Sequence, residues 1–238
     1  FIQLKKKENK LSARLSKNLE FFYGAVTEQE GIFRAQFNQT VTQTHRLSSS
    51  GIKTKFKAFP KEKSVQFQNL PREYKTLFSA RTPGWYMGEV DGAQLEFRVA
   101  ASAGNDSQAK ADIRNGEDIH KFSAATLFGE PVTKAKRQAA KAETFKPLYG
   151  GQSGTPKQRK YYEAFRKKYN GIYKTQVSWI HEVLATGKLK LPWGMIFYWP
   201  GTKMMPDGYI TNTANIFNYP IQSLATAEII PIAHTYLH

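Results

Sequence analysis

Residues 137–151, RQAAKAETFKPLYGG, carry the most informative pattern of the chain and end in two glycines. Two cations and two aromatic rings stand in it at a strict spacing: Arg137, Lys141, Phe145 and Tyr149. On a helix, steps of four residues advance about 40° around the axis, so these side chains are expected to form one slanting stripe about 18 Å long. Pro147 interrupts the stripe and predicts a bend, because proline lacks the N–H and crowds the preceding turn.

The stripe mixes charges with aromatic rings, which neither a core face nor a solvated face requires. It suits a ligand with phosphates at one end and a flat base at the other, because cations neutralise phosphate oxygens and aromatic faces stack on bases. The alternative is an ordinary amphipathic helix whose cations lie in water, since any helix face repeats at this spacing. The spacing alone leaves both interpretations open.

The composition is that of a basic, globular protein. Its 238 residues suffice for one large domain or two small ones, and 40% hydrophobic residues exclude a disordered chain. Lysine and arginine number 35 against 19 acidic residues, a formal charge of +16, which favours a polyanionic partner, either nucleic acid or an anionic membrane surface. Cysteine is absent, which excludes disulfides and thiolate metal sites and fits an intracellular protein. No apolar run is long enough to span a bilayer.

Helices and strands are expected to be irregularly mixed, which favours an α+β fold. Helical periodicity predicts helices over 1–24, 116–129, 133–149, 156–186 and 220–237. Thr133 is expected to cap the third of these, and Pro231 to kink or break the last. In the first half of the chain, the sequence predicts a strand over 31–44, a polar turn over 45–51 and a basic loop over 53–63. It also predicts a buried strand from 85 to about Asp91, which continues as a helix to 101. A hairpin is expected over 188–201, with its turn at Pro192 to Gly194.

Six segments, taken in order along the chain, resemble DNA polymerases of family A, the bacterial DNA polymerase I type. The opening pattern, R-x3-K-x3-F-x3-Y-G, resembles motif B of that family, and DGAQLEFR at 91–98 resembles motif A, D-Y-S-Q-I-E-L-R. The others are NQTVTQTHRLSSS at 38–50, QNLPR at 68–72, EDIHKFSAATLFG at 117–129 and FNYPIQSLATAEII at 217–230. Agreement in order and spacing makes the set far more specific than any one segment.

The resemblance implies a right-hand polymerase fold, in which a helical fingers subdomain is inserted into an antiparallel palm sheet that is incomplete here. The expected divisions are a thumb remnant or basic helix over 1–30, palm with motif A over 31–115, helical fingers with motif B over 116–186, and a return to the palm, lacking motif C, over 187–238. The implied activity is template-directed DNA synthesis, by nucleotidyl transfer from dNTPs to a primer 3′-OH.

For catalysis, the resemblance implies that Asp91 is the motif A metal ligand. The backbone carbonyl of Gly92 would join it, at a position where the family usually has Tyr. Two Mg²⁺ ions are expected in the complete site. Arg137 and Lys141 are expected to complete the catalytic set by meeting the incoming triphosphate. From the residues alone, Asp91 could instead cap the helix that follows it.

The same resemblance implies a nucleotide-binding set made of Gln94, Glu96, His120, Phe145 and Tyr149. His120 would join the triphosphate contacts, Phe145 would pack against the sugar and base, and Tyr149 would lie at the template base. Glu96 matches the steric gate that excludes the sugar 2′-OH, and its alternative role is a surface pair with Arg98 or a nearby lysine.

Primer–template DNA is the implied macromolecular ligand. The residues expected to contact it in the minor groove are Arg46, Asn69, Arg72, Asn218 and Gln222. Acceptors in that groove are similar for all correct pairs, so such donors test the shape of a pair rather than its sequence. The family usually has Gly where His45 stands. The basic loop 53–63 is expected to bind phosphate, and the alternative is a solvated run of charges.

The family's second catalytic carboxylate lies in motif C, an H-D-E triplet, and the 238 residues contain no such triplet. The favoured interpretation is a polymerase divided between polypeptides, with motif C on a partner chain, so that this chain alone is expected to be inactive or nearly so. The compact, divided form suggests a phage, and the expected location is intracellular, at DNA in the cytoplasm or nucleoid of a host cell.

Three alternatives stay open. The chain could be a truncated or nicked product, or a non-catalytic DNA-binding or structural subunit that retains a polymerase scaffold. It could also be related to single-subunit RNA polymerases, which share D-G at motif A. Those enzymes usually carry Tyr where Phe145 stands and lack the continuation through Gln94 and Glu96, which favours DNA over RNA synthesis.

Overall fold

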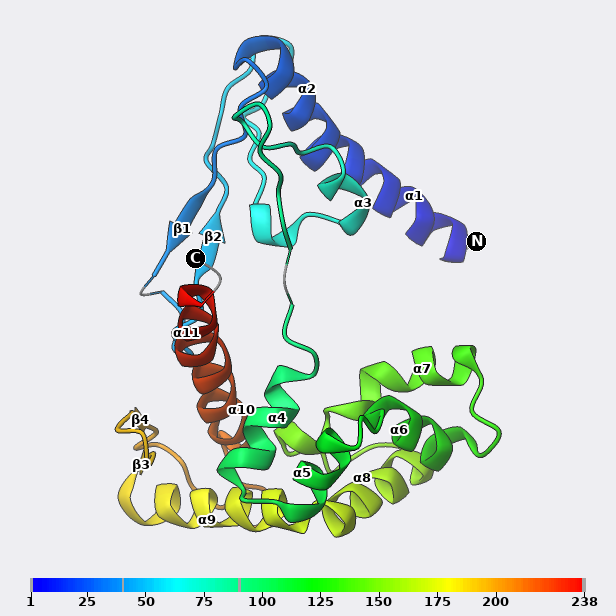
Figure 1. Cartoon of the computed structure of the whole chain (residues 1–238), viewed down its shortest axis with the longest axis vertical. Coiled ribbons are helices and arrows are strands. Elements are labelled where there is room, and N and C mark those ends of the chain that lie inside the picture. Colours follow the sequence, from blue (N-terminus) through cyan, green and yellow to red (C-terminus); the bar gives the residue numbers. More distant parts are fainter. Residues whose placement is uncertain (1, 40, 90, 237–238) are drawn as a thin grey trace. The chain divides into compact units, whose positions relative to one another are not determined.

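A computed structural model of the chain describes residues 2–39, 41–89 and 91–236 (Figure 1). The chain divides into two compact units, Phe1–Asp91 and Gly92–His238, and each has its own hydrophobic core. Among these residues, helices are accompanied by two small antiparallel sheets of two strands each. The predicted mixture of helices and strands is therefore confirmed. No helix among the described residues is long and apolar enough to cross a membrane.

The first unit is built on a long N-terminal helix. It comprises α1 (Ile2–Arg14), a π-helical turn (Leu15–Leu19) and α2 (Glu20–Glu28), which confirms the predicted helix. Phe21 of α2 is buried and packs edge to face against Phe56, with ring centroids 5.4 Å apart. Further rings, such as Phe33 and Phe78 at 5.2 Å, extend this aromatic core. Pairs in this geometry contribute about 0.5–1.5 kcal/mol each beyond their burial.

The sheet of the first unit pairs β1 (Gln36–Asn38) with β2 (Ser48–Ser50), with Phe37 opposite Ser49. The strand predicted over 31–44 is thus only three residues long. The prediction of a turn throughout 45–51 is wrong, because three of its residues form β2. Three consecutive serines carry no apolar alternation and gave no strand signal. The rest of the unit comprises a 3-10 turn (Phe67–Asn69), α3 (Arg72–Lys75) and a basic loop, irregular as predicted apart from one bridge between Thr54 and Lys63.

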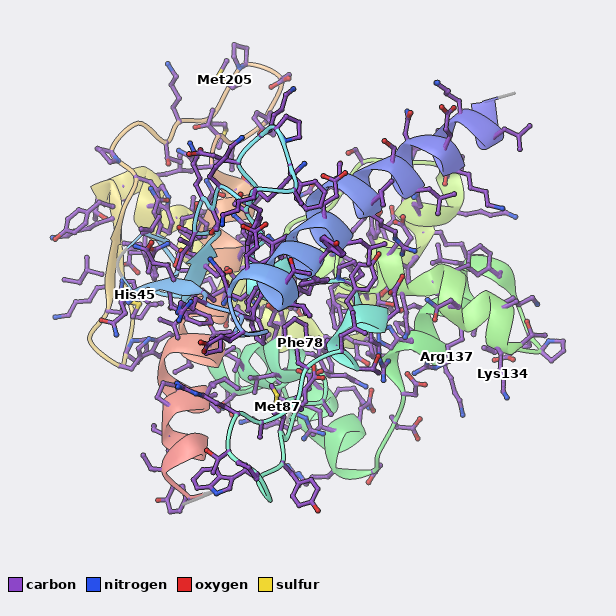
Figure 2. The ribbon with its side chains drawn as sticks, turned by 90° about the horizontal axis from the view of Figure 1, so that it is seen from above. His45, Phe78, Met87, Lys134, Arg137 and Met205 are labelled. Atoms are coloured by element: carbon purple, nitrogen blue, oxygen red, sulfur yellow. The ribbon has the colours of Figure 1, made fainter. Side chains whose placement is uncertain are left out.

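The buried strand predicted from residue 85 to Asp91 is wrong. Trp85 and Tyr86 are 73% and 94% exposed, and none of the described residues of this segment forms a strand. Figure 2 labels Met87, which is also exposed. An apolar run becomes a stable strand only beside neighbours that pair with it. Neither sheet in the described part of the chain includes this segment. The helix predicted after it is confirmed as α4 (Leu95–Ala103).

The second unit is mainly helical. It contains α4, α5 (Ser107–Arg114), α6 (Ile119–Phe128), α7 (Lys134–Thr144), a 3-10 turn (Pro147–Tyr149), α8 (Pro156–Lys168), α9 (Asn170–Thr186), the hairpin of β3 (Lys188–Lys190) and β4 (Ile196–Tyr198), and α10 (Thr213–Ser223). These elements confirm the helices predicted over 116–129 and 156–186 and the predicted hairpin. Figure 1 shows α8 and α9, coloured yellow-green and yellow, following one another along one side of this unit.

Two glycines let the α4–α5 connection approach the start of α9. A Cβ added to Gly104 would lie 2.9 Å from the Cα of Ile172. A Cβ added to Gly171 would lie 2.8 Å from the Cα of Asp106, whose carboxylate accepts the Ile172 N–H at 3.1 Å. Both contacts are with backbone, so a larger residue would force the helices apart.

The C-terminal helical region begins earlier than predicted. It starts with α10, widens into a π-helical turn (Leu224–Ile229) and continues as α11 (Ile230–Thr235). Of the predicted kink or break at Pro231, the break is wrong, because α11 continues through the proline. The π-helical turn Leu224–Ile229 lies directly before it in the same helical run. Residues 237–238, the end of the predicted helix, lie outside the described residues.

Candidate nucleotide-binding site

Two adjacent helices, α6 and α7, hold the predicted triphosphate contacts. α6 begins at Asp118, whose carboxylate accepts the backbone N–H of His120 at 2.9 Å. α7 begins at Thr133, as predicted, with its side chain accepting the Lys136 N–H at 3.2 Å. Each cap contributes about 1 kcal/mol to helix stability. Figure 1 shows the two helices together, and Figure 2 shows Lys134 and Arg137 extending from α7.

Asp118 connects the two helices. Its other carboxylate oxygen accepts a hydrogen bond from Arg137 Nε at 2.6 Å, so one side chain caps α6 and orients a cation of α7. Burial acts to raise the pKa of Asp118. The hydrogen bonds from Arg137 and from the His120 backbone outweigh burial and lower that pKa. The carboxylate is therefore ionised at neutral pH. The sequence interpretation did not select Asp118, although it is the D of the D-I-H segment.

His120 lies half-buried beside these charges. Burial lowers its pKa, the Asp118 carboxylate opposes that shift, and the charges of Arg137 and Lys141 lower the pKa further. The imidazole is therefore neutral at pH 7. Its Nδ1 lies 2.9 Å from Thr144 Oγ1, and that hydroxyl already donates to the Ala140 carbonyl at 3.0 Å. With the hydroxyl proton directed to Ala140, this contact favours the tautomer that donates from Nδ1 and leaves Nε2 for a ligand.

The predicted stripe of four side chains on one helix is wrong. α7 ends at Thr144, so Arg137 and Lys141 lie on the helix while Phe145 and Tyr149 lie beyond its end. Pro147 explains why α7 ends here, because proline has no N–H to continue the backbone hydrogen bonds of the helix. The chain tightens into a 3-10 turn from Pro147 to Tyr149. The predicted bend is thus confirmed, and Phe145 still packs on His120 with ring centroids 5.6 Å apart.

A hydrogen bond joins the start of α4 to the 3-10 turn. The Tyr149 hydroxyl donates to the Glu96 carboxylate. The Arg98 guanidinium donates to the Ala93 carbonyl at 2.9 Å. Gln94 caps α4 in the left-handed region, with φ of 53°, which a residue other than glycine rarely adopts. The structure thus brings Glu96 and Tyr149 together, as one nucleotide site would require.

Gly150 turns the chain back against α10. Its φ is +82°, and an added Cβ would lie 2.9 Å from Cδ2 of the Phe217 ring. α10 carries Asn218 and Gln222, two predicted DNA contacts. The side-chain oxygen of Asn218 is buried and has no hydrogen-bond partner among the described residues. An unmet buried polar atom is costly and often marks a missing ligand or water.

The other predicted residues belong to the first unit or to its border. Arg46 follows His45, which has a φ of 59°, in the left-handed region that favours the Gly expected there from the resemblance. The Asn69 amide donates to Gln66 at the end of the 3-10 turn, and Arg72 opens α3. Asp91 is exposed and ends the first unit.

Gly92 opens the second unit and is close to the start of α4. A Cβ on Gly92 would lie 3.1 Å from the Leu95 Cβ, a tight contact for a larger residue. Family A DNA polymerases are generally Mg²⁺-dependent. Within the described ranges, however, no three His, Asp or Glu side chains form a group that could hold a metal. A hard divalent cation needs several oxygen ligands, and Asp91 alone does not provide them. The described residues therefore do not form a two-metal site by themselves.

Comparison with known proteins identifies the family. The sequence profile of DNA polymerase family A matches residues 3–238. The chain belongs to DNA polymerase family A. Thermostable DNA polymerase I of Thermus filiformis is 31% identical to it over 230 residues, which are 87% of this chain and 26% of that protein. DNA polymerase I of Chloroflexus aurantiacus is 34% identical over 134 residues, 52% of this chain and 13% of that protein.

A solved family A structure shares the fold. The POL domain of Pol1 from M. smegmatis, in complex with DNA primer-template and dNTP, is 22% identical, with a TM-score of 0.58. The match covers 86% of this chain and 37% of that one. The chain spans about a quarter of the length of the Thermus filiformis polymerase. The family predicted from six short segments is confirmed.

Proposed function

We propose that this chain provides the incoming-nucleotide site of a family A DNA polymerase and so takes part in template-directed DNA synthesis. The observation that carries the proposal is the double contact of Asp118, which holds Arg137 and His120 together beside Lys141. Phosphoryl transfer depends mainly on positioning and on charge neutralisation. Two cations of α7, of which Arg137 is oriented by Asp118, supply both.

In this proposal, Arg137 and Lys141 bind the triphosphate and His120 Nε2 adds a third contact. Phe145 packs against the sugar and base, and Tyr149 lies at the template base. Glu96, held by the Tyr149 hydroxyl, excludes a sugar 2′-OH, and Gln94 fixes the start of α4 beside it. These roles follow from family membership together with the contacts around Asp118 and Tyr149.

Primer–template DNA would be held from both units. Arg46, Asn69 and Arg72 would contribute from the first unit. Asn218 and Gln222 would contribute from α10, through the N–H groups of their side-chain amides. Donors of this kind read the similar minor-groove acceptors of all correct pairs.

The metal-binding carboxylates would be divided. Asp91, with the Gly92 carbonyl, would provide the motif A ligands for Mg²⁺. The second carboxylate would come from a motif C segment, which these 238 residues do not contain. In the divided arrangement favoured by the sequence, that segment lies on a partner polypeptide, and this chain alone is inactive.

Nucleotide binding tests the proposed site. The chain should bind a fluorescent dNTP, and Arg137→Ala and Lys141→Ala should each weaken that binding at least about tenfold, because a hydrogen bond to a charged group contributes about 1.5–3 kcal/mol. The matched control is Lys174→Ala, which removes an exposed lysine on α9 of the same unit. Equal dNTP affinities for all four proteins would contradict the proposed site.

A further inference from the structure

The basic loop, residues 53–63, is anchored to the rest of the first unit. The Phe56 side chain is 1% exposed, and its ring covers Gly24 of α2, where an added Cβ would lie 2.4 Å from a ring carbon. The backbone N–H groups of Lys57 and Ala58 both donate to the Glu28 carboxylate, at 2.9 and 3.3 Å. The loop therefore has a defined conformation and is more than a solvated run of charges.

Its five lysines fall into two groups. Lys55 folds back onto its own loop and donates to the Phe59 carbonyl at 3.1 Å. Lys63 pairs with Glu20 and lies 5.5 Å from the centroid of the Phe59 ring. The side chains of the other three are exposed and have no hydrogen-bond or ion-pair partner in the described part of the chain: Lys53, Lys57 and Lys61. These three charges are available to a ligand.

Two of the three available lysines line one groove. Lys53 and Lys61 border a cavity of about 1040 Å³, and Lys57 does not. Ser50 and Asn69 line the same groove, and they belong to the R-L-S-S-S and Q-N-L-P segments expected to contact DNA. The lining also includes Glu62, the one acidic residue of the loop.

We propose that this groove binds the sugar–phosphate backbone of duplex DNA through Lys53 and Lys61. The inference rests on the proposed function, which makes primer–template DNA the duplex. Lysine ammonium groups neutralise phosphates without reading bases, and each contact releases a counterion. A concave, polar groove fits the projecting phosphate ridge of a duplex better than the flat surface of an anionic bilayer.

Salt dependence of DNA binding tests the groove. Fluorescence anisotropy would give the affinity of the chain for a labelled primer–template between 50 and 200 mM salt. Losing two phosphate contacts should reduce the slope of log K against log salt by about 1.8 in Lys53→Gln/Lys61→Gln. Over that fourfold range of salt, the unaltered chain should lose about 12-fold more affinity than this variant.

Two variants of the same loop serve as controls. Lys57→Gln removes the same charge outside the groove and should leave the slope unchanged. Glu62→Gln removes a repulsive carboxylate inside the groove and should tighten binding. Circular dichroism melts check that all variants fold. Lys53→Gln/Lys61→Arg keeps one of the two charges and should recover about half of the lost slope, about 0.9.

Each outcome decides one question. An unchanged slope of log K against log salt in Lys53→Gln/Lys61→Gln would contradict DNA binding by the groove. An equal decrease of that slope in Lys57→Gln would also contradict it. If Lys53→Gln/Lys61→Gln lost binding to phosphatidylserine vesicles but kept the salt dependence of DNA binding, the ligand of the groove would be a membrane surface and the proposal would be wrong. DNA binding through the groove without primer extension under any condition would contradict the proposed polymerase function but not the groove.

Discussion

Asp118 has two separable functions within one side chain. One oxygen caps α6, and the other orients Arg137. The first function needs only an acceptor, which asparagine also provides. The second needs a negative charge. The two functions can therefore be separated with two substitutions.

We expect Asp118→Asn to destabilise the fold less than Asp118→Ala, by about 1 kcal/mol, because asparagine keeps the helix cap. Both variants should weaken dNTP binding to a similar extent, because both release Arg137. Urea unfolding monitored by circular dichroism gives the first comparison, and dNTP titration gives the second. Equal unfolding free energies would mean that the cap does not contribute.

His120 predicts a pH dependence with a defined sign. Its pKa is lowered in the free protein by burial and by the neighbouring cations. A triphosphate beside Nε2 should raise that pKa, so binding takes up a proton. Affinity should then be greatest at low pH and fall as pH rises through the pKa of the bound state, by at most about tenfold for each unit by which binding raises the pKa.

Titration of dNTP affinity from pH 5.5 to pH 8 tests this expectation. The nucleotide also titrates in this range, and His120→Gln isolates that background because glutamine keeps a polar side chain without a titrating proton. Identical pH profiles for the two proteins would exclude His120 from the triphosphate contacts.

The helices were predictable because each carries local signals. Thr133 and the periodic apolar positions placed the start of α7 correctly, although the helix ends at Thr144 and not at 149. Two further errors concern strands, which depend on partners distant in sequence. Ser48–Ser50 forms a strand without any apolar pattern, and the run from residue 85 is apolar but has no pairing strand among the described residues.

The stripe from Arg137 to Tyr149 shows that regular spacing alone does not determine the geometry of a segment. Steps of four predicted a continuous stripe, and the effect of Pro147 had been limited to a bend. In the structure the helix ends before Pro147, and the aromatic residues lie on a separate 3-10 turn. The residue types were informative about the site, while the geometry required the structure.

The 3-10 turn depends on its close contact with α10. Gly150→Ala places a Cβ in the left-handed region and against the Phe217 ring. Each effect costs about 1 kcal/mol or more, so we expect a clear loss in the free energy of unfolding. Gly116→Ala is the control, since Gly116 also has a positive φ, +70°, but an added Cβ there meets nothing within 4 Å. An equal loss in both variants would show that packing on α10 contributes nothing.

For the whole chain, the sequence was sufficient to identify the family, and the family in turn suggested the candidate site residues. The resemblance supplied Arg137, Lys141, His120, Phe145 and Tyr149. It did not reveal Asp118 or Thr144 as their supports, because those contacts join side chains 19 and 24 residues apart in the sequence. The sequence also could not predict that the side-chain oxygen of Asn218 is buried without a hydrogen-bond partner, because this depends on how α10 packs.

The two units carry different parts of the proposed activity. Asp91 ends the first unit and the cation cluster lies in the second, and motif C lies in neither. Polymerisation should therefore require both units and an added motif C carboxylate. With only one candidate catalytic carboxylate, the 238-residue chain is expected to bind DNA and dNTP without extending a primer.

Primer extension with Mg²⁺ and four dNTPs is the decisive experiment, using the chain alone and then with a second polypeptide that contains motif C. We expect extension only in the combined reaction, and its loss in Asp91→Ala. Extension by these 238 residues alone, or unchanged extension by Asp91→Ala in the combined reaction, would contradict the proposed division of the catalytic carboxylates.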